Sequence, residues 1–441
     1  MIDRLTENLL QRSFTPLVRE GRLEIGLPWG RTLCFGDGGL PQARLRFTDR
    51  RALWAVMRDP DLNFGEMFMQ QRLCVEQGSI YDVLELLLRG ARDVPVSASV
   101  RLLDSWRMRL KPLLQHNLRG RSRANVAHHY DLDDRLYALF LDAERQYSCA
   151  YFEQGDESLE QAQRAKMRHI AAKLLVDPGH SVLDIGCGWG GLSRYLAEVA
   201  QAGHVTGITL SQEQFAGARG RAGASPAADR LEYRLQDYRD TRGRFDRIVS
   251  VGMFEHVGTR FHDAFFRQCK ELLADDGVML LHFIGNSDVP DFNNPWIERY
   301  IFPGGHIPSM SEFTPAIERA GLVVTDIEVL RLHYARTLRL WRERFLARRD
   351  EAARLYDERF CRMWEFYLSM SETAFRYQDI AIFQVQLARR QEAVPLTRSY
   401  VEQRSQALRA REAGPGAQQP GAGPGATPAL RPRRTTVPAA G

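Results

Sequence analysis

An acid and an imidazole end an apolar run in the middle of the chain. Residues 248–258 read IVSVGMFEHVG, so that Glu255 and His256 follow a stretch with the composition of a buried strand. Open parallel sheets bind ligands at the carboxyl ends of their strands. We therefore expect Glu255 to face a ligand cleft. His256 is expected to be structural, because adjacent residues that leave a strand point apart.

A glycine-rich turn supplies a second candidate site. Residues 182–198 read VLDIGCGWGGLSRYLAE, which is a strand that passes through a turn into a helix. Glycines let the backbone turn tightly and come close to a ligand at the helix N-terminus. The turn contains Gly186, Gly188 and Gly190, with Asp184 before them as an acceptor for a ligand amine and Trp189 as a flat apolar wall. This pattern indicates a cofactor site.

The next strand argues against a nicotinamide cofactor. A dinucleotide site needs an acid near the end of the second strand to hold a ribose. The strand in HVTGITLSQEQ instead offers Thr209 and Ser211, followed by Glu213 and Gln214. The acid-and-glycine turn resembles that of S-adenosylmethionine-dependent methyltransferases.

Strands and helices alternate from about residue 181. Segments of helical spacing separate short apolar runs, which lie at 181–186, 204–210, 231–237, 245–252 and 277–285. This alternation predicts an α/β fold with a parallel sheet covered on both faces. A helical block at about 331–377 is expected as an insertion, and the alternating IAIFQVQLA at 380–388 as an edge strand.

Other segments flank this core. Residues 1–120 are expected to form a smaller N-terminal domain that ends in a basic linker, and residues 121–392 the main domain. The run SIYDVLELLLRG predicts a packed helix that ends near Gly90. A C-terminal helix is expected at 393–413. Residues 414–441, rich in Gly, Pro and Ala, are predicted to be a disordered tail.

Cysteine and histidine spacing excludes several kinds of site. The 441-residue chain has 6 cysteines without a paired or metal-ligand spacing, so neither a disulfide framework nor a zinc site is indicated. His128 and His129 lack a third ligand at a useful spacing, and no metal is predicted. No secretory signal opens the chain, and no run reaches the roughly 18 apolar residues that span a bilayer. We expect a cytoplasmic protein with at most peripheral membrane contact.

Basic residues gather in one stretch, although the net charge of the chain is only +5. Residues 101–123 contain seven basic side chains and one acid, which suits the phosphates of lipid or nucleic acid, or else a solvated helix. No nucleic-acid-binding signature accompanies them, and no nucleic-acid partner is predicted.

Five separated blocks carry a resemblance to a known family. They are HHYDLDDRLYALFLDAERQYSCAYF, MFEHVG, LHFIG, WIERYIFPGGHIPS and HYARTLRLWRERF. Together, over residues 120–390, they resemble the cyclopropane-fatty-acyl-phospholipid synthase and mycolic acid cyclopropane synthase family. The resemblance implies a Rossmann-like, seven-stranded methyltransferase sheet. The run FGEMFMQ in the N-terminal part is similar to the lipid-synthase branch, which implies that the domain at 1–120 is lipid-associated.

The resemblance also implies a reaction and its residues. The π electrons of a cis double bond in a phospholipid acyl chain take the methyl group of S-adenosylmethionine, a proton leaves, and a cyclopropane closes, with bound bicarbonate as the base. Carried over residue by residue, the bicarbonate cage falls on Glu255, His282, Tyr334, Cys149 and Ile284, the last two through backbone N–H groups. The cofactor contacts fall on Tyr147, Ser148, Asp184, Gly186, Gly188, Gly190, Thr209 to Gln214, Asp237 and Tyr238. Asp237 could instead cap the next turn.

One position departs from the family pattern. Ser371 stands where relatives commonly carry a cysteine once proposed as catalytic, which leaves a methyl-branched or methylene-branched product as an alternative to the ring. An alternative of another class is a catalytically inactive lipid-binding relative. The expected partner is the surface of an unsaturated phospholipid bilayer on the inner face of the membrane, and the oligomeric state is left open, with a homodimer as one alternative.

Overall fold

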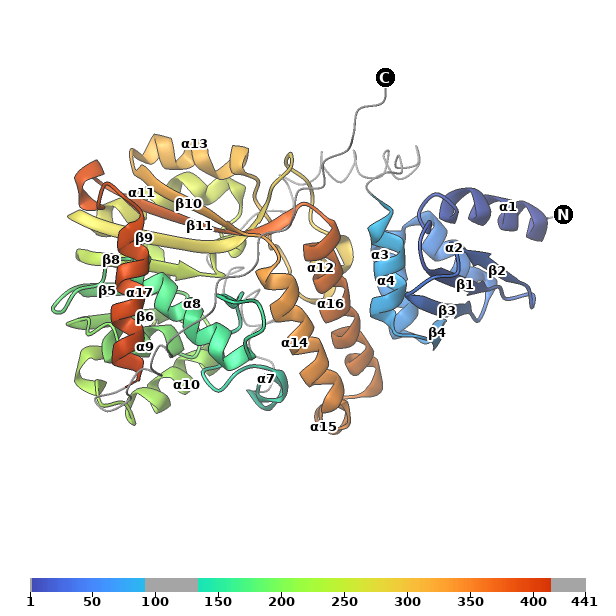
Figure 1. The fold of residues 1–441 in the computed structure, drawn as a ribbon, viewed down its shortest axis with the longest axis horizontal. Coiled ribbons are helices and arrows are strands. Elements are labelled where there is room, and N and C mark those ends of the chain that lie inside the picture. Colours follow the sequence, from blue (N-terminus) through green and yellow to red (C-terminus); the bar gives the residue numbers. More distant parts are fainter. Residues whose placement is uncertain (1, 92–133, 414–441) are drawn as a thin grey trace, which may run out of the picture.

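The computed structural model describes residues 2–91 and 134–413, which form two α/β units that lie side by side (Figure 1). The basic stretch 101–123, the pair His128 and His129, and the tail 414–441 fall outside the described residues. Within the described ranges, no helix is both long and apolar enough to cross a membrane.

The N-terminal unit is a small four-stranded sheet with helices packed on it. Its strands, ordered β2-β1-β3-β4, are β1 (Arg22–Gly26), β2 (Thr32–Phe35), β3 (Gln42–Phe47) and β4 (Leu73–Gln77). Its helices are α1 (Ile2–Phe14), α2 (Arg50–Arg58), α3 (Pro60–Met69) and α4 (Ile80–Arg89). Helix α4 begins at a capping box formed by Ser79 and Asp82 and ends at its C-cap, Gly90, as predicted.

The larger unit contains a seven-stranded sheet in the order β10-β11-β9-β8-β5-β6-β7. Its strands are β5 (Ser181–Ile185), β6 (His204–Thr209), β7 (Leu231–Leu235), β8 (Phe245–Val251), β9 (Leu273–Asn286), β10 (Val323–Leu330) and β11 (Ile380–Ala388). Strands β5 to β9 are parallel, and β11 runs antiparallel to both β9 and β10. The predicted α/β fold with a mainly parallel sheet is confirmed.

The prediction that residues 380–388 form an edge strand is wrong. Strand β11 lies between β9 and β10, and β10 is the edge. The alternating polar residues of β11 suggested a solvent-facing side, but Gln384 and Gln386 are fully buried. Gln384 bonds to His282, and Gln386 donates to the Tyr400 hydroxyl at 2.8 Å. Buried amides that have such partners are compatible with an inner strand.

Two hydrophobic cores lie on the two faces of this sheet, because successive side chains of a strand alternate between faces. Val182 and Leu280 pack with α8, α9 and α17, whereas Leu183 and Leu281 pack with α11 and α13 on the opposite face. The helices that flank the sheet are α8 (Leu159–Lys173), α9 (Gly191–Glu198), α10 (Gln212–Ala222), α11 (His262–Leu272), α13 (Met310–Ala320) and α17 (Ser399–Glu412).

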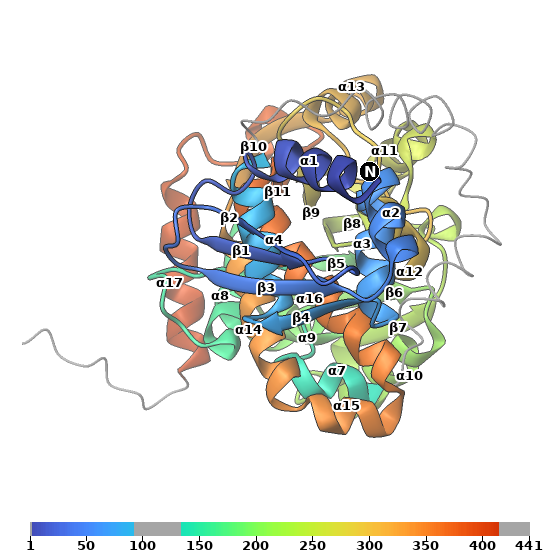
Figure 2. The same ribbon diagram turned by 90° about the vertical axis from the view of Figure 1, so that its right-hand side faces the viewer.

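Three helices are inserted between β10 and β11, as predicted: α14 (His333–Ala347), α15 (Arg349–Leu355) and α16 (Glu358–Tyr377). They stand between the large sheet and the N-terminal unit (Figures 1 and 2). Helix α16 packs on α3 and α4, and Tyr377 donates to Glu85 of α4 at 2.5 Å. Tyr300 of α12 (Pro295–Tyr300) donates to Glu66 of α3 at 3.1 Å. The N-terminal unit is therefore docked on the inserted helices.

Candidate active site

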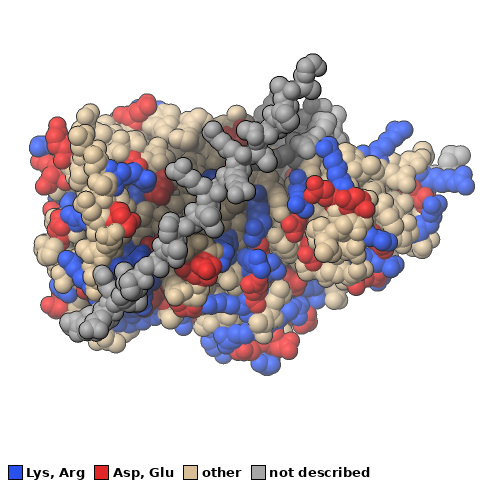
Figure 3. Space-filling model, in the orientation of Figure 1, with Lys and Arg blue, Asp and Glu red and all other residues tan. Residues whose placement is uncertain are grey.

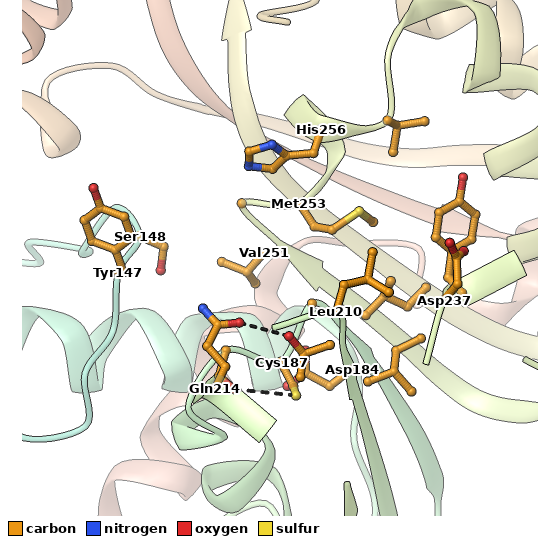
Figure 4. Close-up of a pocket in the computed structure, with 18 of the residues that line it drawn as sticks. Tyr147, Ser148, Asp184, Cys187, Leu210, Gln214, Asp237, Val251, Met253 and His256 are labelled. Atoms are coloured by element: carbon orange, nitrogen blue, oxygen red, sulfur yellow. Dashed lines mark hydrogen bonds between the residues drawn. The ribbon is translucent and has the colours of Figure 1, made fainter. Parts of the chain in front are cut away.

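A cavity opens at the carboxyl ends of β5, β6, β7 and β8, the edge that was predicted to bind a ligand (Figure 4). Its wall includes ten of the predicted cofactor residues, namely Tyr147, Ser148, Asp184, Gly186, Gly188, Thr209, Leu210, Gln214, Asp237 and Tyr238. Residues to which the sequence assigned no role also line it, among them Arg145, Gln146, Met253, Pro303 and Gly304. The fold thus gathers these positions from distant parts of the chain.

Gly190 is the one predicted cofactor glycine outside the cavity wall. Gly186, Gly188 and Gly190 have φ values of +81°, +55° and +80°, which L side chains rarely adopt. A Cβ on Gly190 would lie 2.5 Å from the hydroxyl oxygen of Tyr233, which donates to the Gly190 carbonyl at 3.1 Å. Gly190 therefore shapes the turn and its packing, whereas Gly186 and Gly188 face the cavity.

Asp184 is the penultimate residue of β5 and is buried in the wall of the cavity. Its Oδ2 accepts the hydroxyl of Ser193 at 2.6 Å, and burial raises the pKa of its carboxyl to about 6. One hydroxyl occupies only part of the acceptor capacity of a carboxylate. Asp184 can therefore accept a further hydrogen bond from a ligand.

The loop after β6 is held by its own side chains. Ser211 caps α10 by accepting the backbone N–H of Gln214 at 3.2 Å. The hydroxyl of Thr209 donates to Oε1 of Gln214 at 2.9 Å. With its oxygen engaged, Gln214 can offer its amide N–H groups to a ligand in the cavity.

Asp237 adopts the capping role that the sequence left as an alternative. It begins the 3₁₀ turn η3 (Tyr238–Asp240) by accepting the backbone N–H of Arg239 at 3.0 Å. It also forms a bidentate ion pair with the guanidinium of Arg239, at 2.8 and 2.6 Å. Asp237 lines the cavity while making these bonds.

A buried lysine to which the sequence assigned no role lies behind the cavity wall. Lys166 of α8 is fully buried, and its Nζ donates to Oε1 of Gln146 at 2.5 Å and to Oγ of Ser148 at 2.8 Å. Burial lowers the pKa of Lys166 to about 8. Lys166 thus anchors the segment that carries Tyr147. No local signal could have found it, because lysines on helices are mostly exposed.

Glu255 lies just past the end of β8, in the 3₁₀ turn η4 (Phe254–His256). Pairing of β8 with β9 ends at Val251 and His282, so the N–H of Ile284 extends beyond the last paired residue of β8. Oε1 of Glu255 accepts that N–H at 2.6 Å. Oε2 is buried without a hydrogen-bond partner among the described residues, and burial raises the pKa of Glu255 to about 7.

His282 lies within β9 and is fully buried. Nε2 of Gln384 lies 3.2 Å from Nδ1 of His282 and donates to it, so the imidazole proton is on Nε2. Burial holds the pKa of His282 well below its ordinary value, which keeps the ring neutral. Nε2 is buried without a partner in the described part of the chain. It is therefore a donor available to a ligand.

Of the other predicted cage residues, Tyr334 lies in the first turn of α14, Ile284 lies on β9, and Cys149 lies in the segment before α8. Tyr334 is buried in α14, where its ring lies 4.7 Å from that of Phe375. Cys149 is buried and its raised pKa keeps the thiol neutral, while the next N–H, of Ala150, donates to Thr337 at 3.0 Å. The N–H of Ile284, predicted to hold an anion, instead binds Glu255.

The predicted cage lies beside the cavity rather than in its wall. Glu255, His282, Tyr334, Cys149 and Ile284 are absent from the cavity lining, but Cys149 directly follows Ser148, which lines it. His256, which we predicted to be structural, is part of the wall (Figure 4). Burial lowers the pKa of His256 to about 4, so the ring is neutral at pH 7.

An aromatic cluster joins the cavity to the inserted helices. The ring of Tyr147 stacks on Trp341 of α14 at 5.2 Å, and its hydroxyl lies 2.9 Å from that of Tyr367 of α16. Phe140 of α7 (Asp134–Phe140) packs against both Trp341 and Trp364. Ser371 lies further along α16 and is half-buried.

Comparison with known sequences shows similarity over the larger unit and, for one relative, beyond it. The family model for mycolic acid cyclopropane synthetase matches residues 118–385. The cyclopropane-fatty-acyl-phospholipid synthase of Escherichia coli (strain K12) is 43% identical over 275 residues, which cover 62% of this chain and 70% of that protein. The tuberculostearic acid methyltransferase UfaA1 of Mycobacterium tuberculosis is 37% identical over 341 residues, which cover 74% of this chain and 79% of that protein.

Solved structures agree with the sequence comparison. The cyclopropane synthase MmaA2 from Mycobacterium tuberculosis is 35% identical, with a TM-score of 0.57 over 60% of this chain and 98% of that chain. The mycolic acid cyclopropane synthase CmaA1, in a complex with SAH and CTAB, is also 35% identical. Its TM-score is 0.57, and the match covers 60% of this chain and 97% of that chain.

Proposed function

Because the chain belongs to the mycolic acid cyclopropane synthetase family of S-adenosylmethionine-dependent methyltransferases, we propose that it converts cis double bonds of unsaturated phospholipid acyl chains into cyclopropanes, with bound bicarbonate as the base. The observation that carries this proposal is the pair of unsatisfied buried groups beside the cavity. They are an acceptor, Oε2 of Glu255, and a donor, Nε2 of His282.

The reaction balances without a protein nucleophile. S-adenosylmethionine supplies a methyl group on a positively charged sulfur. The π electrons of the alkene form the new C–C bond while the S–CH₃ bond breaks and leaves its electrons on sulfur. A proton must then leave the transferred methyl group, and the electrons of that C–H bond close the ring. The protein has to bind the cofactor, exclude water and hold a base.

The cavity residues suit the first of these tasks. Asp184 would accept a hydrogen bond from the cofactor, and the amide of Gln214 would donate one to it. Gly186 and Gly188 let the cofactor approach the protein backbone. Lys166 keeps Ser148 and Gln146 in place through hydrogen bonds from behind.

The aromatic cluster suits the second task, because a carbocation would be quenched by water. Trp341 and Trp364 are almost completely buried, and Tyr147 and Tyr367 connect them to the cavity. Buried aromatic rings also present negative faces that favour a nearby positive charge. We place the acyl chain against this cluster.

The groups beside the cavity suit the third task. Bicarbonate carries both a hydroxyl donor and anionic acceptor oxygens, and it would supply a base that takes the proton from the transferred methyl group. Oε2 of Glu255 would accept from its hydroxyl, and Nε2 of neutral His282 would donate to its oxygen. Burial raises the pKa of Glu255, so this carboxyl would more readily share a proton with the bound anion.

The membrane surface would be reached through the N-terminal unit. On α1, Ile2, Leu5 and Leu9 lie at helical spacing and are 65%, 63% and 47% exposed. The acids of this helix are neutralised from within the unit, Asp3 by Arg50 and Glu7 by Arg31. Such an apolar stripe fits peripheral contact with the inner face of a phospholipid bilayer.

A second product is favoured by one relative. UfaA1 is described as a tuberculostearic acid methyltransferase. A C-methyltransferase would lose a different proton and leave a methylene branch, and a methyl branch would need a separate hydride donor to reduce the cation.

Expression in cells rich in cis-unsaturated lipids distinguishes these products. We expect mass spectrometry to show fatty acids that have gained one CH₂ and that resist mild hydrogenation. A product that still takes up hydrogen under those conditions contradicts ring formation, and no new product supports the inactive lipid-binding alternative. Glu255→Gln, expressed at the same level, is the matched control.

A further inference from the structure

A second groove, of about 520 Å³, lies on the outer side of the inserted helices. It is bounded by the first turns of α14, the end of α16 and the loop after Phe152. Three arginines line it, Arg336, Arg339 and Arg376, together with the apolar side chains of Phe152, Leu332 and Leu340. Figure 3 shows basic side chains gathered over this region of α14 and α16. The groove combines positive charge with an apolar floor.

The charge of this groove is only partly neutralised by the protein. Arg339 donates to Glu343 at 2.7 Å, and Arg376 lies 3.0 Å from Glu372. The guanidinium of Arg336 instead lies over the ring of Phe152, 5.0 Å from its centroid. Nε of Arg336 is buried and has no hydrogen-bond partner among the described residues. A buried guanidinium N–H without an acceptor is unfavourable, so an oxyanion bound in the groove would stabilise this group.

The groove backs onto the predicted cage. His333 lines the groove and is followed directly by Tyr334 in α14. The backbone N–H of Phe152 donates to Nδ1 of His333 at 3.0 Å, which joins the two walls of the groove. The chain from Phe152 leads back in three residues to Cys149. A ligand anchored here would therefore be close to the proposed site of methyl transfer.

We propose that this groove binds the phosphate group of a phospholipid, with Arg336 as its main contact and Arg339 and Arg376 at the rim. This inference rests on the proposed function, in which a phospholipid is the substrate. A guanidinium matches two phosphate oxygens in a bidentate geometry, which a lysine cannot do. Phe152, Leu332 and Leu340 would contact the apolar part of the lipid next to the phosphate.

Binding to two kinds of electrically neutral vesicle tests the proposal. Vesicles of saturated phosphatidylcholine carry a phosphate, whereas vesicles of digalactosyl diacylglycerol do not. We expect Arg336→Gln in the full chain to weaken co-sedimentation with the phosphatidylcholine vesicles about tenfold, as the loss of one charge-assisted contact would do, and to leave glycolipid binding unchanged. Arg339→Gln, on an exposed side chain, should weaken the same binding less. Arg354→Gln, an exposed arginine of α15 outside the groove, should change neither.

Two outcomes would overturn the inference. In the first, Arg336→Gln weakens binding to both kinds of vesicle equally. In the second, it weakens binding to neither, whether or not it abolishes the binding of inorganic phosphate measured by calorimetry. If Arg336→Gln still binds vesicles but no longer binds inorganic phosphate, the ligand of the groove is free phosphate. Arg336→Lys keeps the charge over Phe152 and should bind phosphatidylcholine vesicles with intermediate affinity, at an unchanged melting temperature.

The test is independent of the reaction, because saturated chains offer no double bond. Turnover is measured separately, as release of S-adenosylhomocysteine on unsaturated phosphatidylcholine. If wild-type turnover is absent but vesicle binding still depends on Arg336, the proposed reaction fails and the phosphate site stands.

Discussion

The carboxylate of Glu255 accepts the backbone N–H of Ile284 at 2.6 Å, at the point where β8 has ended and β9 continues. This bond fixes one oxygen of the carboxylate and leaves the other, Oε2, buried without a partner among the described residues. One oxygen of this carboxylate thus binds the backbone of β9 at Ile284, two residues after His282. The other oxygen remains available as an acceptor.

Glu255→Gln should separate these two roles. The amide oxygen of glutamine can still accept from Ile284, so the fold and the affinity for S-adenosylmethionine should be retained. The remaining amide donates where the carboxylate accepts, so we expect the turnover number to fall about 100-fold or more, the range for removal of a group that assists proton transfer. Calorimetric titration and S-adenosylhomocysteine release measure the two quantities. Glu271→Gln, an exposed site on α11, is the control; wild-type turnover in Glu255→Gln would refute the role of Glu255.

Glu255 should also make stability depend on pH. Its pKa is raised from 4.5 to about 7, so the folded state retains a proton that the unfolded state has released. The free energy of unfolding should therefore fall as the pH rises from about 4.5 to about 7, by at most about 3 kcal/mol. Glutamine does not titrate. The melting temperature of Glu255→Gln minus that of wild type should increase between pH 5 and pH 8 in CO₂-free buffer, and a constant difference would contradict burial of the carboxyl.

Lys166→Met should weaken cofactor binding indirectly, because Lys166 lies behind the cavity wall and does not contact the cofactor itself. The substitution leaves Oε1 of Gln146 and Oγ of Ser148 without their buried donor, so the segment that carries Tyr147 loses its anchor. We expect the dissociation constant for S-adenosylmethionine to rise about tenfold, as for loss of a charged hydrogen bond. Lys270→Met, on α11, removes a bond to the Ala320 carbonyl away from the cavity and should leave this constant unchanged. An unaltered constant in Lys166→Met would show that the segment holds its place without the lysine.

Ser371→Ala and Ser371→Cys should both keep turnover within about twofold of wild type, because substitutions away from the reacting groups have small effects. Methyl transfer to an alkene needs no protein nucleophile, and Ser371 is half-buried on α16. Product analysis by mass spectrometry should show the same product in both variants. A large gain in turnover with the thiol, or a switch of product, would mean that position 371 takes part in the chemistry.

Leu5→Asp combined with Leu9→Asp should impair attachment to vesicles. Both side chains are exposed, so the variant should fold with an unchanged melting temperature, while charges on the apolar stripe of α1 should lower co-sedimentation with phospholipid vesicles severalfold. Leu396→Asp, at a fully exposed position in the loop before α17, controls for loss of surface hydrophobicity. Equal effects of the two changes would place the membrane contact elsewhere.

The sequence by itself determined the fold class and part of the cavity wall. The alternation of strands and helices, and the glycine turn with Asp184 before it, are local patterns whose causes lie within a few residues. Such patterns place Thr209 and Asp237 at strand ends, and the topology of a parallel sheet then brings those ends to one edge.

Only the tertiary structure decided which polar groups are satisfied. Strand β11 is an inner strand because it pairs with both β9 and β10, and its buried Gln384 donates to His282, which fixes the proton of the imidazole on Nε2. Lys166 is buried because Gln146 and Ser148 meet it from another segment. Burial of a polar side chain depends on partners that are remote in the chain, and no local periodicity records them. The same reason explains why Ile284 N–H binds Glu255 rather than remaining a donor for an anion.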